Sequence, residues 1–187
     1  MVETLHTLTA LGHKAPQLVE IGPYRIVERF DVALASIATR KGREADVAKA
    51  AAAAKIPLPD PARWVGAEPW SVFWVAPAMW FVEAPFATHE DILSHLKHAF
   101  GDAASISEQT DAWVRYDLSG QALPTLLERL SNVDLVQVPV GFATRTLIEH
   151  LGCYLIKKSG TEISLYGARS SAVNLLHALE IAARSVL

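Results

Sequence analysis

Apolar and polar residues follow patterns that predict both strands and helices in the first half of the chain. Residues 32–39 form a mostly apolar run typical of a strand, and residues 42–54 predict an alanine-rich helix. Residues 73–83 predict a hairpin with a proline in its turn. Residues 88–100 predict an amphipathic helix that opens with Thr-His-Glu-Asp, a sequence resembling a capping box.

The second half of the chain follows a similar order. Residues 112–118 alternate as a strand, and a helix is expected to begin near Pro124, because proline is tolerated in the first helical turn. Three further strands are expected around residues 144–150, 152–158 and 162–166. Ser170 or Ser171 is expected to cap a final amphipathic helix.

These two halves form a weak internal repeat. Residues 29–109 and 110–187 each predict a strand, a helix, a hairpin and a capped helix. The pattern predicts an α+β fold of two pseudo-related halves. Because neither half is expected to bury its sheet face alone, we expect residues 29–187 to form a single domain.

Residues 1–28 carry apolar side chains without a helical or strand period. Ordering such a segment costs conformational entropy, so we expect an N-terminal arm that gains its order from a partner's surface. On this hypothesis, deleting residues 1–28 leaves the domain folded but weakens assembly. The alternative is that the arm packs on its own domain and covers an edge of the sheet, in which case the truncated chain assembles as well as the full one.

Composition and charge exclude several classes of function. The 187 residues are 51% hydrophobic and carry a net charge of −3, which argues against a disordered chain and against nucleic acid as a partner. The longest apolar run, residues 72–82, is interrupted by Pro77, so no membrane span is expected. Residues 1–11 lack the pattern of a secretory signal, and Cys153, the only cysteine, permits no internal disulfide. We therefore expect a cytoplasmic protein with a buried thiol.

Motifs for catalysis or metal binding are absent from the sequence. It contains no phosphate loop, no dinucleotide fingerprint and no hydrolase or kinase signature. His95 and His98 are three residues apart on a helix but lack a third ligand, so a solvated face is favoured over a metal site. We expect no catalytic, cofactor-binding or metal residue in this chain.

The strand that ends at His150 carries charged residues. On a strand, Arg145, Leu147 and Glu149 are expected to share one side, while Thr146, Ile148 and His150 share the other. A catalytic role would require a third partner. A structural or interface role is therefore favoured for Arg145, Glu149 and His150.

Aromatic residues are concentrated in one region. Seven of them fall within residues 64–86: Trp64, Trp70, Phe73, Trp74, Trp80, Phe81 and Phe86. Since tryptophan is enriched at interface hot spots, Trp70, Trp74 and Trp80 are candidate contacts to a partner protein.

Six longer segments together resemble the gamma subunit of heterotetrameric sarcosine oxidase. They are residues 33–42, 73–85, 110–120, 123–135, 143–152 and 165–171. The likeness extends from about residue 30 to the end of the chain, with the same order of segments.

This resemblance implies a fold similar to the folate-binding domain of the glycine-cleavage aminomethyltransferases (T-proteins), in which duplicated α+β halves exchange strands. It also implies a complex of alpha, beta, gamma and delta subunits that oxidatively demethylates sarcosine to glycine. In that family the FAD, FMN, NAD and tetrahydrofolate belong to the alpha and beta subunits and the zinc to delta, whereas gamma has no known catalytic group.

Two alternatives stay open at this stage. One is a gamma-type subunit of a related complex, such as an N-methylglutamate dehydrogenase. The other is a free-standing tetrahydrofolate-binding protein, which would need a carboxylate for the pterin. Asp117 and Glu83 are the acids that could be nominated.

Overall fold

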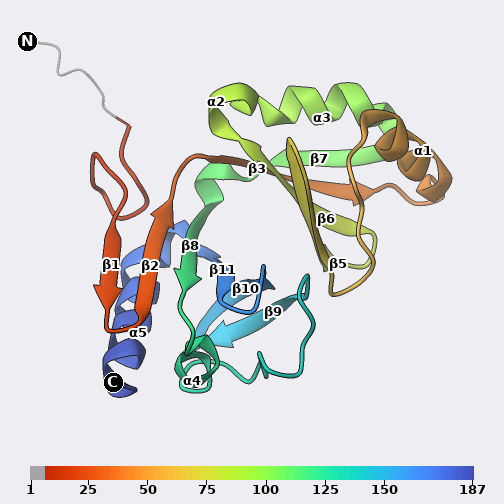
Figure 1. Ribbon diagram of the computed structural model, residues 1–187. Helices are drawn as coiled ribbons and strands as arrows, with labels where there is room; N and C mark the ends of the chain where they lie inside the picture. Colours follow the sequence, from red (N-terminus) through yellow and green to blue (C-terminus); the bar gives the residue numbers. More distant parts are fainter. Residues whose placement is uncertain (1–6) are drawn as a thin grey trace, which may run out of the picture. The chain divides into compact units, whose positions relative to one another are not determined.

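The computed structural model describes residues 7–187, which divide into two compact units (Figure 1). The six-stranded unit comprises residues 7–30, 112–138 and 146–187, and the five-stranded unit comprises residues 31–111 and 139–145. Both units contain the expected order of strand, helix, hairpin and helix. They differ from the predicted organisation in two places. Residues 7–30, most of which were assigned to the arm, join the unit built mainly from the second half, and residues 139–145 of the second half join the unit built mainly from the first.

The six-stranded sheet has the strand order β1-β2-β8-β11-β10-β9. These strands are β1 (Leu18–Ile21), β2 (Tyr24–Arg29), β8 (Trp113–Ser119), β11 (Glu162–Ala168), β10 (Leu151–Lys157) and β9 (Ala143–Ile148). The helices of this unit are the short α4 (Leu123–Leu127) and the longer α5 (Ala172–Ser185). Strands β8, β9, β10 and β11 and both helices lie close to the predicted positions.

One face of the six-stranded sheet forms a core with α4 and α5. Along β8, Val114, Tyr116 and Leu118 are buried, and they alternate with more exposed side chains. The Tyr116 hydroxyl donates a hydrogen bond to the carbonyl oxygen of Ala172 at the start of α5 (3.0 Å). A Cβ at Gly167 would meet a terminal methyl group of Leu175 on α5 at 2.6 Å, so a larger residue there would require the Leu175 side chain to shift.

The five-stranded sheet has the strand order β4-β5-β6-β3-β7. These strands are β4 (Trp64–Ala67), β5 (Trp70–Ala76), β6 (Met79–Pro85), β3 (Val32–Thr39) and β7 (Ala104–Glu108). The helices of this unit are α1 (Glu44–Ala54), α2 (Phe86–His89) and α3 (Ile92–Phe100). Strands β4 and β7 were not expected from the sequence.

Small residues let two helices pack closely on this second sheet. Ala33 and Ala35 of β3 are fully buried beside Val47 of α1 and Leu96 of α3 in one apolar core. Buried alanines therefore contribute to this core from both the sheet and α1.

Helix α3 is capped one turn later than the sequence predicted. Its N-cap is Asp91, whose carboxylate accepts a hydrogen bond from the Ser94 amide (3.1 Å). This hydrogen bonding holds the pKa of Asp91 below its usual value. Thr88, the residue predicted to cap the helix, lies within α2, because the chain forms a separate short helix before the corner.

The described part of residues 1–28 packs on its own unit as the edge of the six-stranded sheet, which agrees with the alternative interpretation and not with an arm ordered by a partner. Strands β1 and β2 form a hairpin, and β2 pairs with β8 through contacts such as Ile26 opposite Leu118. Figure 1 shows β1 and β2, in red and orange, beside the green strand β8. Tyr24 and Ile26 are buried in the core of the same unit. Residues 1–6 of the expected arm lie outside the described residues.

Glu28 explains why the sequence concealed this strand. It follows Tyr24 and Ile26 on the buried face of β2, so a carboxylate interrupts the apolar alternation. Glu28 is only 2% exposed, and its two oxygens accept hydrogen bonds from the amides of Leu11 (3.1 Å) and Gln17 (3.0 Å). A buried carboxylate that is paired in this way fixes the loop before β1.

No helix within residues 7–187 is long and apolar enough to cross a membrane.

Replacement of Glu28 should destabilise the six-stranded unit. In Glu28→Gln, one side-chain oxygen becomes a donor that faces a backbone donor, so we expect a loss of roughly 1–3 kcal/mol in unfolding free energy. Urea denaturation followed by circular dichroism measures this loss. Glu20→Gln on the exposed face of β1 is the matched control, and equal stability of the two variants would contradict the role given to Glu28.

Candidate functional site

Trp70 and Trp80 have partners within the five-stranded unit. The Trp80 indole donates a hydrogen bond to the Pro59 carbonyl (2.8 Å) and so fixes the proline-rich loop before β4. Trp70 packs against the core of the unit, and its ring meets the His89 ring at 4.8 Å in an edge-on arrangement. Both side chains are half-buried and contribute to the packing of their own unit.

Trp74 lies on the same face of the β5–β6 hairpin. It stands opposite Trp80 in the register of the two strands and is half-buried. The alternate positions Phe73 and Phe81 face the other side, where their rings meet edge-on at 5.4 Å. The hairpin therefore carries large apolar side chains on both faces.

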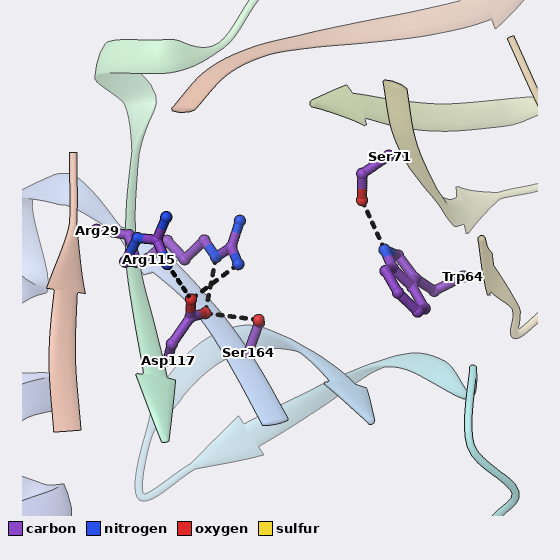
Figure 2. Close-up of polar contacts among 6 residues, drawn as sticks. All are labelled: Arg29, Trp64, Ser71, Arg115, Asp117 and Ser164. Carbon is purple, nitrogen blue, oxygen red and sulfur yellow. Dashed lines mark hydrogen bonds and ion pairs between the residues drawn. The ribbon is translucent and has the colours of Figure 1, made fainter. Parts of the chain in front are cut away.

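Trp64 lies on the face of Phe73, opposite Phe73 in the register of β4 and β5. Its indole donates a hydrogen bond to the Ser71 hydroxyl (2.7 Å), as Figure 2 shows. The ring also covers Gly66, where an added side chain would meet the indole at 3.0 Å. This glycine keeps space for the ring at the edge of the sheet.

The charged residues of the β9 region fit the predicted alternation only up to Ile148. Arg145 is exposed, while Thr146 and Ile148 are buried. Strand β9 ends at Ile148, and Glu149 and His150 are exposed in the turn to β10. His150 therefore does not share a buried face with Thr146 and Ile148, because the chain turns before it, with a positive φ of 53° at Glu149.

Asp117 is held by three neighbours, as Figure 2 shows. On β8 it follows Tyr116, whose buried side chain faces α5, so Asp117 lies on the opposite face of the sheet. Its carboxylate accepts hydrogen bonds from Arg29 (3.2 Å), from two nitrogens of Arg115 (2.8 and 2.9 Å) and from the Ser164 hydroxyl (2.6 Å). The Arg115 guanidinium also lies over the Tyr166 ring, 5.8 Å from its centroid. These contacts join β2, β8 and β11.

Both oxygens of Asp117 are already used by these donors. A carboxylate engaged by two guanidinium groups and a hydroxyl is a poor general base and has little remaining capacity for a pterin. Glu83, the other nominated acid, is 3% exposed on β6. The two acids belong to different units.

The histidine pair observed in the structure was missed in the sequence. His95 was considered with His98, but its ring instead lies 5.0 Å from that of His89. His89 belongs to the short helix α2, and the sequence pattern did not predict this helix. No group of three potential metal-ligating side chains occurs among residues 7–187.

Cys153 is buried against the core of the six-stranded unit. Burial raises the pKa of its thiol to about 11, so the thiol is protonated at neutral pH. The side chain lacks the exposure and the thiolate character of a reactive cysteine.

The sequence matches no family model, and a search of curated proteins also finds no match. Solved structures do resemble the chain. The heterotetrameric sarcosine oxidase from Corynebacterium sp. U-96, in complex with pyrrole 2-carboxylate, contains a chain that matches with a TM-score of 0.78 and 18% identity. The match covers 87% of this chain and 85% of that one.

A second similar structure is the glycine cleavage system aminomethyltransferase T from Bartonella henselae. It matches with a TM-score of 0.59 and 11% identity over 84% of this chain, which spans 48% of that protein. At such identities the likeness concerns the fold. The expectation of an α+β class is confirmed, since helices combine with two antiparallel sheets. The fold of this chain is similar to that of the sarcosine oxidase chain and to that of about half of the aminomethyltransferase.

Proposed function

We propose that this chain is a non-catalytic, gamma-type subunit of a heterotetrameric sarcosine oxidase. The observation that carries the proposal is the fold match, which extends over most of both chains. A match of this extent favours a counterpart of one whole subunit over a domain of a larger chain. Partner subunits of the alpha, beta and delta types would hold the FAD, FMN, NAD, tetrahydrofolate and zinc.

The polar side chains give the proposal further support. Asp117 is engaged by Arg29, Arg115 and Ser164, and the thiol of Cys153 is buried and protonated. These contacts give Asp117 and Cys153 structural roles, which supports a subunit without catalytic groups of its own. A subunit that supports the assembly of a complex requires no more from them.

Fewer residues are proposed as partner contacts than the sequence indicated. Trp70 and Trp80 pack within their own unit, so their loss would also disturb that packing. Arg145, Glu149 and His150 are exposed. We propose that these three residues, together with Trp74, contact the partner subunits.

Likeness to the aminomethyltransferase favours a second candidate, a free-standing tetrahydrofolate-binding protein. The pairing of Asp117 with two arginines is evidence against that candidate. A related complex that oxidises another N-methyl amino acid is the third possibility. It would use the same subunit surfaces.

The isolated chain should be colourless and should produce no peroxide from sarcosine. The chain should purify together with flavin and activity when it is co-expressed with the alpha, beta and delta subunits encoded in the same genome. Absorbance spectra and a peroxide assay provide the measurements. Flavin or peroxide production in the isolated chain, or failure to co-purify with the other subunits, would contradict the proposal.

Tetrahydrofolate should show no saturable binding to the isolated chain in calorimetry. The folate-binding alternative predicts micromolar affinity, about −8 kcal/mol, which would be lost in Asp117→Asn. On our proposal, Asp117→Asn only lowers the unfolding midpoint, because the side chain loses its negative charge and one of the two oxygens that accept from Arg29, Arg115 and Ser164. Micromolar binding that depends on Asp117 would replace our proposal with this alternative.

Reversal of the charge at Arg145 should weaken assembly without unfolding the chain. We expect Arg145→Glu to lower recovery in the co-expressed complex several-fold, since like charges across an interface repel. Lys49→Glu, an exposed change on α1 of the same unit, is the matched control. If both variants assemble like the unmodified chain, Arg145 is not an interface residue.

A further inference from the structure

His89 and His95 meet across a short corner between two helices. His89 is the last residue of α2, and His95 lies in the first turn of α3, so only Glu90 and Asp91 separate the helices. The centroids of the two imidazole rings are 5.0 Å apart, and the rings are tilted by 45°. The contact between the rings thus bridges the corner.

Further contacts hold the His89 ring in place. Trp70 of β5 meets the ring edge-on at 4.8 Å, with an angle of 69° between the ring planes. The Thr88 hydroxyl lies 2.8 Å from Nδ1 of His89. His89 is half-buried by these neighbours, whereas His95 is exposed.

The charges around the corner favour an imidazole pair that is not doubly protonated. Two of the neighbours of His89, Trp70 and Thr88, carry no charge. They therefore do not offset the repulsion that a protonated His95 exerts on a protonated His89. Asp91 interacts electrostatically with His95 and with Lys97, but its carboxylate already accepts the cap hydrogen bond of α3. Glu90, which lies between the two helices, is exposed. Two imidazolium groups in contact would repel each other.

We propose that this corner is a pH-sensitive contact, in which His89 packs against Trp70 while at least one imidazole is neutral and separates from it when both are protonated. Helix α3 stays on the sheet during this change, because Ile92, Leu96 and Phe100 anchor it in the core. The movement is therefore confined to the end of α2. This inference does not depend on the proposed function.

The direction of the pH dependence follows from the neighbours of His89. Partial burial, and then the charge of His95, lowers the pKa of His89. The folded state thus favours the neutral ring. The contact is complete above about pH 6.5, the unperturbed pKa of histidine, and it is lost as the pH falls through the lowered pKa.

Nuclear magnetic resonance of the full chain tests this contact. Histidine ring signals and the Trp70 indole N–H signal are followed from about pH 8 to about pH 5. We expect His89 to titrate below about pH 6.5, the ordinary histidine value, and the Trp70 indole signal to shift with the midpoint of His89. In His95→Gln, the midpoint of the His89 titration should move to higher pH, because the positive charge of His95 is removed. The midpoint of the pH-dependent shift of the Trp70 signal should move with it.

His98→Gln is the matched control, one helical turn further along α3, and should leave both midpoints unchanged. The circular dichroism spectrum should stay constant throughout, which separates local movement from unfolding. The proposal is overturned if the Trp70 signal does not change while His89 titrates. It is also overturned if His95→Gln leaves the midpoint of His89 unchanged.

Discussion

The six-stranded unit depends on the pairing of β8 with strands from both ends of the chain. On one side β8 pairs with β2, and on the other it pairs with β11. On the core face of β8, the Tyr116 hydroxyl donates a hydrogen bond to the start of α5. On the opposite face, the Asp117 carboxylate accepts hydrogen bonds from Arg29 and Ser164. Each face of one strand thus joins segments that are distant in sequence.

Much of the fold could be predicted where the apolar period is regular, and less where a polar residue occupies a buried position. The hairpin of β5 and β6 and helix α5 follow clear patterns. Strand β2 was missed because Glu28 stands where an apolar residue was expected, and only the amides of Leu11 and Gln17 make that placement possible. Strand β7 was missed because Ser105 and Ser107 make it too polar to recognise.

The candidate site was predicted less well, since its residues depend on tertiary contacts. Tryptophan content correctly located a concentrated aromatic region, but the sequence could not show that Trp80 bonds Pro59. Similarly, helical spacing suggested a pair of His95 with His98. In the structure, the corner between α2 and α3 brings the His89 ring next to the His95 ring instead. Asp117 was nominated from the sequence as a candidate acid. Its arginine partners could not be predicted, because Arg29 lies on β2, far from Asp117 in the sequence, and no local pattern indicates the contact with Arg115.

The wide sequence separation of β2 from β8 has a consequence for synthesis on the ribosome. The β1–β2 hairpin is synthesised before its partner: the residues of β8 that pair with β2 follow about 90 residues later, which takes several seconds at ordinary translation rates. During that interval the edge of β2, with Tyr24 and Ile26, has no sheet to join. The nascent chain thus exposes a strand edge of the kind that chaperones cover, while much of the five-stranded unit is still being made.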